Sequence, residues 1–152
     1  MRKIVALLIS VVVWMVGTVC IAAVSPNQAA LGGIRPGAKM EAVKRIYGMP
    51  EQREQSYSRM EGDYIEVWTY GGSFEIHFVG DAVVFMKSTA NNGIKTPAGF
   101  TVGSNINAIR NYLGTPFVEY NDCLWYQTTD GVDLAFYFIN GKVYEIRTGF
   151  PD

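Results

Sequence analysis

The sequence repeats itself at a fixed offset, and this repeat constrains the fold more than any other feature. The segment GIRPG at residues 33–37 matches GFTVG at residues 99–103, and GMP at 48–50 matches GTP at 114–116. Each matched pair is separated by 66 residues (103 − 37 = 66), with no gap across the block. Self-similarity at a constant offset indicates one structural unit used twice.

Each unit reads as a helix followed by three strands. Apolar residues recur at helical spacing over residues 39–47 and 104–113, and each pattern stops at a glycine with a proline two positions further on. Alternating apolar and polar residues follow, interrupted by dipeptides such as Asp130-Gly131 and Asn140-Gly141 that favour tight hairpin turns. The strands are expected over residues 64–70, 73–79, 82–88, 120–127, 132–139 and 142–148.

The expected fold class is therefore α+β. We predict two tandem repeats, over residues 33–92 and 93–152, each a helix followed by a three-stranded antiparallel meander. A unit of this size buries little core alone, so the two sheets are expected to join or to pack closely side by side. The polar, charged segment at residues 51–62 is expected to be a loop.

The N-terminal segment has the pattern of an export signal. Arg2 and Lys3 give a basic start, residues 4–24 carry no charge, and small residues follow. The apolar run is also about as long as a membrane-spanning helix. We expect residues 1–25 to be a cleaved signal or an N-terminal membrane anchor, with cleavage after Ala23 or after Ala30 both open, and residues 26–32 to be a linker. The remainder would be periplasmic, extracellular or anchored at its N-terminus.

The charge balance argues against nucleic acid as a partner. Without Arg2 and Lys3, 11 basic residues (13 − 2 = 11) face 14 acidic ones, and no basic stripe is present. The exported part retains one cysteine, Cys123, so no internal disulfide can form there. Cys123 is interpreted as a small buried side chain in preference to a reactive thiol. Membrane contact is expected only through the N-terminal segment, if it is retained.

The repeated positions also resemble a known family. A glycine, an aliphatic residue and a Gly-x-Pro stop recur in order, followed by a Phe-x-Asn-Gly-x-Val hairpin or a looser form of it. The positions are Gly37, Val43 and 48–50 with 78–83 in the first unit, and Gly103, Ile109 and 114–116 with 138–143 in the second. This pattern resembles the SmpA/OmlA (BamE-type) outer-membrane lipoproteins and their tandem relatives, the β-lactamase-inhibitor-protein-like domains, over nearly all of residues 33–150.

The resemblance implies an envelope protein that binds other proteins and performs no catalysis. Single-unit members of the family serve outer-membrane protein assembly, and tandem members present a concave sheet to a protein partner. The chain departs from the lipoprotein type at Cys20, because Gly17 and Val19 do not form a lipobox with it. It departs from the tandem inhibitor type because neither unit has a disulfide. These departures leave the partner open.

No group of residues in the sequence has the pattern of a catalytic, metal or cofactor site. His77 is the only histidine, and strand alternation places it on the face away from Ile76 and Phe78. An enzyme that uses Cys123 with His77 is a weak third possibility. The scattered carboxylates have no metal-ligand spacing, and the glycine pairs are not placed as phosphate cradles. We therefore expect a non-enzymatic protein without cofactors.

Aromatic residues of the strands are the remaining candidates for function. Tryptophan and tyrosine on an exposed sheet face are favoured anchors for protein binding. The candidate protein-binding residues are Trp68, Tyr70, His77, Trp125 and Tyr137. The alternative for the two tryptophans is a place in the core, packed against the helices. Two functions follow: a protein partner in the cell envelope bound through the sheet surface, or a small ligand or cell-wall fragment bound in a groove between the two units.

Overall fold

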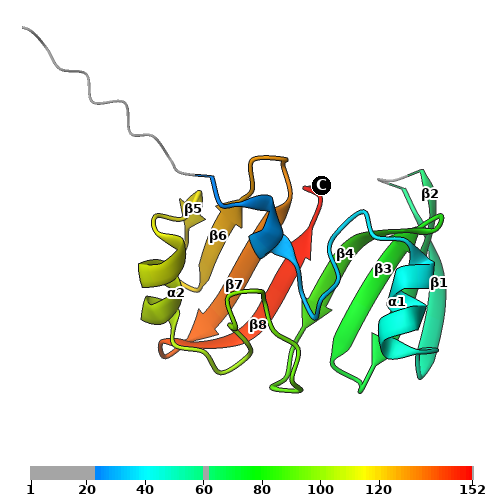
Figure 1. The fold of residues 1–152 in the computed structure, drawn as a ribbon, viewed down its shortest axis with the longest axis horizontal. Helices are drawn as coiled ribbons and strands as arrows, with labels where there is room; N and C mark the ends of the chain where they lie inside the picture. Colours follow the sequence, from blue (N-terminus) through cyan, green and yellow to red (C-terminus); the bar gives the residue numbers. More distant parts are fainter. Residues whose placement is uncertain (1–22, 60–61, 152) are drawn as a thin grey trace, which may run out of the picture.

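The computed structural model describes residues 23–59 and 62–151, so nearly all of the expected export segment lies outside the described part. Within these residues, eight strands form one antiparallel sheet in the order β1-β2-β3-β4-β8-β7-β6-β5 (Figure 1). The strands are β1 (Gln52–Ser58), β2 (Asp63–Tyr70), β3 (Phe74–Val79), β4 (Ala82–Ser88), β5 (Val118–Glu119), β6 (Cys123–Gln127), β7 (Asp133–Ile139) and β8 (Lys142–Gly149). The helices are the short 3-10 helix η1 (Pro26–Ala29), α1 (Met40–Tyr47) and α2 (Ile106–Leu113).

The predicted fold class, two helix-plus-three-strand repeats with sheets side by side, is wrong. The segment expected to be a loop contains β1, which pairs with β2 from Gln52↔Thr69 to Ser58↔Asp63. This strand lies at the sheet edge with nearly all its side chains exposed, so no apolar alternation marked it in the sequence. Of the two arrangements expected for the sheets, joining is the one observed, because β4 pairs with β8 from Phe85↔Gly149 to Ser88↔Ile146 and makes one continuous sheet in place of two sheets packed side by side.

The two α-helices lie where the sequence predicts them. The two α-helices begin 66 residues apart (106 − 40 = 66), and Gly48 and Gly114 follow them with φ of 76° and 80°. Such a positive φ costs glycine little, which explains a glycine at both helix ends. The register shifts after His77 in the β3–β4 pair and after Tyr137 in the β7–β8 pair, 60 residues apart (137 − 77 = 60).

One face of the sheet is covered by the helices and by the chain that precedes them (Figure 1). Residues 24–35, named the strap here, run between the two helices and include η1. The strap differs from the expected linker because Ala29 and Leu31 are fully buried in the core. The Thr148 hydroxyl donates a 2.9 Å hydrogen bond to the Ala29 carbonyl. The strap therefore belongs to the folded domain.

The core lies between this cover and the sheet. Its large side chains come from both halves of the chain, including Trp68, Ile76, Phe136 and Ile109, all of which are fully buried. Among the described residues, no helix is both long enough and apolar enough to span a membrane. The opposite face of the sheet, called the open face below, has no helix over it in the described part of the chain.

Candidate functional site

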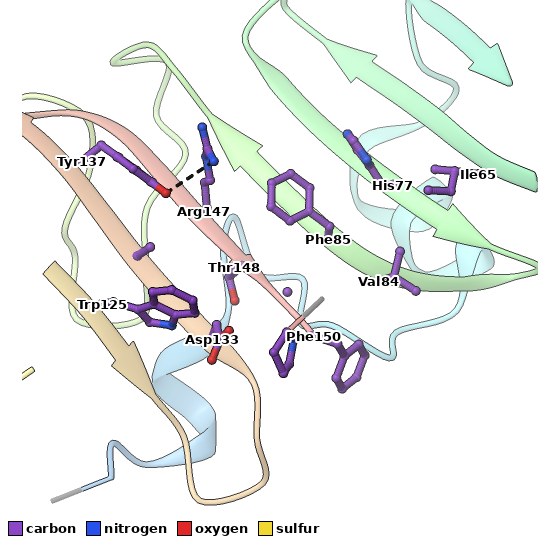
Figure 2. Close-up of a pocket in the computed structure, with 13 residues that line it drawn as sticks. Ile65, His77, Val84, Phe85, Trp125, Asp133, Tyr137, Arg147, Thr148 and Phe150 are labelled. Carbon is purple, nitrogen blue, oxygen red and sulfur yellow. Dashed lines mark hydrogen bonds between the residues drawn. The ribbon is translucent and has the colours of Figure 1, made fainter. Parts of the chain in front are cut away.

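The open face carries a groove of about 570 Å³ at the junction of the two halves of the sheet. Its lining comes from strands β2, β3, β4, β6, β7 and β8 and from the two residues after β8 (Figure 2). The lining residues are Ile65, His77, Val84, Phe85, Trp125, Asp133, Ala135, Tyr137, Arg147, Thr148, Gly149, Phe150 and Pro151. The groove is thus mainly apolar and aromatic, with few polar groups.

The groove exists because two small residues occupy the central strands. Residues directly opposite each other in antiparallel strands share a face. In one row across the sheet, Ala135 lies between Trp125 and Arg147. In the neighbouring row, Gly149 lies between Phe85 and Asp133. Ala135 and Gly149 form the floor, and the larger side chains on either side stand up as walls.

Gly149 also permits the close contact of β8 with β4. A Cβ atom at this position would lie 2.9 Å from the Val84 carbonyl oxygen and 3.0 Å from the Phe85 ring. The main chain continues this contact, because the Phe150 amide donates a 3.1 Å hydrogen bond to the Val84 carbonyl. Any larger residue at 149 must displace the backbone of β4 or the ring of Phe85.

The cationic wall of the groove is built from Arg147. Its guanidinium lies 4.4 Å from the centre of the Tyr137 ring and donates a weak 3.4 Å hydrogen bond to the Tyr137 hydroxyl (Figure 2). The Arg147 Nε also donates to the Glu145 carboxylate in an ion pair. Burial raises the pKa of the Tyr137 phenol above its ordinary value, so this hydroxyl stays protonated at neutral pH. Arg147 is therefore fixed in place, and Glu145 neutralises its charge.

A polar corner lies around Trp125 and Asp133, across Ala135 from Arg147 (Figure 2). The Trp125 Nε1–H is buried and has no hydrogen-bond acceptor within the described residues. The Asp133 Oδ1 accepts a 3.1 Å hydrogen bond from the neutral amide of Gln127. In the described part of the chain, Asp133 forms no ion pair. The corner thus offers one unused donor and one carboxylate without a cation.

His77, on β3, forms part of the groove wall on the β2–β4 side. Its Nε2 lies 3.4 Å from a Glu75 carboxylate oxygen, and its ring meets the Phe85 ring edge-on at 4.9 Å. Lys87 lies 3.0 Å from the same Glu75 carboxylate. Burial lowers the pKa of the imidazole below its ordinary 6.5, and Glu75 opposes this shift only in part. His77 is therefore mainly neutral at pH 7.

The lowered pKa of His77 predicts a pH-dependent loss of stability. As the pH falls below about 6.5, the unfolded chain binds a proton at His77 before the folded chain does, so the free energy of unfolding decreases. Urea unfolding at about pH 7.5 and about pH 5.5 should show this decrease, and His77→Gln should reduce it. The carboxylates with lowered pKa values, such as Glu75, lose their contribution only at lower pH. An unchanged pH slope in the variant would contradict the assignment.

The structure separates the five predicted binding residues into two groups. His77, Trp125 and Tyr137 line the groove on the open face. Trp68 is fully buried on the other face, 4.8 Å from the Phe78 ring, with its Nε1 donating to Glu66 at 2.6 Å. Tyr70 is also on the helix side, where its hydroxyl donates to the Gly48 carbonyl at 3.0 Å. Trp68 and Tyr70 thus support α1 and do not reach the groove.

The sequence-based search missed several groove residues, among them Phe85, Asp133, Arg147 and Phe150. Strand alternation already places Asp133 on the same face as Tyr137. That signal could have drawn attention to Asp133. The nearness of Phe85 to the second half of the chain depends on the β4–β8 pairing, which has no local signature.

The groove does not bring Cys123 and His77 together. Cys123 is on β6 and His77 on β3, four strand steps apart in the sheet, which corresponds to about 19 Å. Burial, with a smaller effect of Asp122, raises the pKa of the Cys123 thiol to about 11, so the thiolate is scarce at neutral pH. Within the described residues, no cluster of three or more His, Cys, Asp and Glu side chains could hold a metal ion.

Comparisons with known proteins relate the fold to secreted proteins. No protein-family model and no curated protein matches the sequence. An extracellular protein containing an SCP domain, from Bacillus anthracis, superposes with a TM-score of 0.56 at 12% identity, over 76% of this chain and 44% of its own. A cysteine-rich secretory protein from Staphylococcus aureus superposes with a TM-score of 0.60 at 12% identity, over 83% of this chain and 46% of its own.

These likenesses concern the fold alone, because the identities are low, and the chain spans less than half the length of either protein. A candidate β-lactamase inhibitor protein from Streptococcus mutans is a weak neighbour, with a TM-score of 0.33 at 14% identity over 83% of this chain and 89% of its own. The resemblance to SmpA/OmlA proteins stays a prediction.

Proposed function

We propose that this chain is a non-enzymatic, exported envelope protein that binds another protein through the open face of its sheet. One observation carries the proposal: the helices and the strap cover one face, while the other keeps a groove with aromatic walls and an unused indole donor. A buried donor without an acceptor costs free energy, and a bound partner could supply the acceptor. This function is of the kind that the SmpA/OmlA resemblance implies.

The composition of the groove supports a protein as the partner. Tryptophan, tyrosine and arginine are enriched among the residues that dominate the energy of protein interfaces. Trp125, Tyr137 and Arg147 stand together around the floor at Ala135. Arg147 is held against Tyr137 before any partner arrives, so little side-chain entropy remains to be lost on binding.

Export is supported by the sequence of the first 25 residues and by two neighbours of the fold that are named as extracellular or secretory proteins. The strap narrows the choice between the two cleavage positions. A cut after Ala30 would remove Val24 and Ala29, which are buried, whereas a cut after Ala23 would leave the strap intact. Of the two cleavage positions, we therefore favour the one after Ala23.

Filling the groove should weaken binding strongly. In Ala135→Phe, a phenyl ring would rise from the floor between Trp125 and Arg147 and exclude the partner. The full-length chain is crosslinked in native envelope and then recovered. The wild type should yield a crosslinked partner, and the variant should yield about tenfold less of that partner. Ala108→Phe is the matched control, because Ala108 is exposed on α2, away from the open face. Equal recovery with both variants would remove the groove from the interface.

A small ligand or cell-wall fragment is the second candidate. The groove volume of about 570 Å³ falls within the usual range of ligand sites, which is about 300–1,000 Å³. A thermal-shift screen with glycans separates this function from the first, because a ligand that binds the native state raises the unfolding midpoint.

A further inference from the structure

We propose that the groove receives a basic side chain, lysine or arginine, from the protein partner, with the cationic group against Asp133. This inference rests on the proposed function and adds the chemistry of the partner to it. The occupant is a partner segment that places one long cationic side chain in the groove and one main-chain carbonyl at Trp125.

The charges around the groove leave one carboxylate uncompensated. Arg147 is paired with Glu145, and Lys87 is paired with Glu75. Asp133 accepts a hydrogen bond from a neutral amide, and no cation contacts it within the described residues. His77 is mainly neutral at pH 7 because burial lowers its pKa. The groove thus carries a net negative charge at Asp133, which a cationic occupant complements.

The walls next to Asp133 suit the rest of a basic side chain. The methylene stem of a lysine or arginine buries well along apolar surface while its charged end reaches a polar group. The rings of Trp125, Phe85 and Phe150 line this path (Figure 2). Aromatic faces also attract a cation through the negative charge of their π-electrons.

The unused Trp125 donor selects against other occupants. A partner segment brings a main-chain carbonyl that can accept from Nε1–H. A purely apolar side chain would bury Asp133 without compensation, which is costly. A sugar ring would place hydroxyl groups against Val84, Phe85 and Pro151, which cannot bond them. A peptide with a basic side chain supplies a partner to both polar groups, a cation to Asp133 and a carbonyl to Trp125.

Two peptides that differ only in charge test the inference. The full-length chain is titrated with acetyl-Gly-Lys-Gly-amide and with the same peptide carrying norleucine, whose stem is as long but neutral. The indole N–H resonance of Trp125, identified by its loss in Trp125→Phe, reports binding directly. We expect the lysine peptide to bind about tenfold more tightly, the size of a charge-assisted hydrogen bond. Equal affinities, or no shift of this resonance with the lysine peptide at millimolar concentration, would overturn the inference.

Variants then assign the preference to one carboxylate. Asp133→Asn keeps an oxygen for Gln127 but loses the charge, and should abolish the preference for lysine. Asp63→Asn changes the net charge by the same amount, but at the exposed start of β2, and this variant should keep the preference for lysine. A preference that survives in Asp133→Asn would refute the assignment. If Asp133→Asn folds poorly, the comparison of the two peptides on wild-type protein decides.

The outcomes separate this inference from the proposed function. Recovery of a partner that is lost in Ala135→Phe, without any preference for the lysine peptide, would leave the protein-binding function standing and refute the basic side chain. Recovery that is unaffected by Ala135→Phe would refute the proposed function, whatever the peptides show.

Discussion

Replacing Trp68 by alanine should lower the free energy of unfolding by about 3–5 kcal/mol, the usual cost of removing a large buried aromatic side chain. Trp68 is fully buried, contacts the Phe78 ring at 4.8 Å and donates from Nε1 to Glu66 at 2.6 Å. The substitution leaves a cavity beneath α1 and removes one of the hydrogen bonds to Glu66, whose carboxylate keeps its ion pair with Arg53. Because a domain of this size is stable by only about 5–15 kcal/mol, the variant should lose a large share of its stability.

Trp125→Ala is the matched control, and it should affect partner binding more than stability. Trp125 is only half-buried, and its indole N–H has no partner to lose. We expect a clearly smaller loss of stability in urea unfolding and a strong loss of partner recovery. Similar destabilisation by the two substitutions would mean that Trp125 is a core residue and that the groove has been misassigned.

Gly149→Val should have the second-largest effect. Its Cβ would lie 2.9 Å from the Val84 carbonyl, and the branched side chain would press further into Phe85. Overpacking of this kind costs about 1–3 kcal/mol, and here it acts on a junction of only four residue pairs. We expect both a lower urea midpoint and a loss of partner recovery, because Gly149 belongs to the β4–β8 junction and also forms part of the groove floor.

The control for Gly149→Val is Ala135→Val, which adds branched bulk on the neighbouring strand, where a Cβ atom is already accommodated. Its cost in stability should be smaller, since the added methyl groups extend into the groove. A junction that tolerates Gly149→Val as well as Ala135→Val would show that β4 and β8 can separate without loss, contrary to the packing described.

The parts of the fold that local patterns encode could be predicted from the sequence. The apolar spacing and the stops at Gly48 and Gly114 located both α-helices, and alternation located the middle strands β3 and β7. β1 could not be found, because an exposed edge strand has no buried side to mark it. The pairing of β4 with β8 could not be found either, because it joins residues about 60 positions apart and depends on Gly149 fitting against Val84.

The candidate site was predictable to the extent that alternation reveals a face. Alternation places His77 on the side away from the core, Tyr137 is one of the candidate binding residues, and both line the groove. Trp68 and Tyr70 are a tryptophan and a tyrosine like Trp125 and Tyr137, but their side chains lie on the helix side of the sheet. Only the packing of α1 reveals this difference. The floor was not predictable, because Ala135 and Gly149 have no distinguishing chemistry and matter only through the larger residues beside them.

The β4–β8 pairing also determines how late in synthesis the sheet can be completed. Residues 85–88 find their partner strand only after residues 146–149 have been synthesised, when all the other strands have already been made. Until then β4 is a bare edge with free main-chain donors and acceptors, able to pair with the wrong chain. At that stage the β2–β4 side and the β6–β7 side of the groove are not yet joined. Binding capacity should therefore appear abruptly with the last strand, and an incomplete chain would be more prone to aggregate than to capture a partner early.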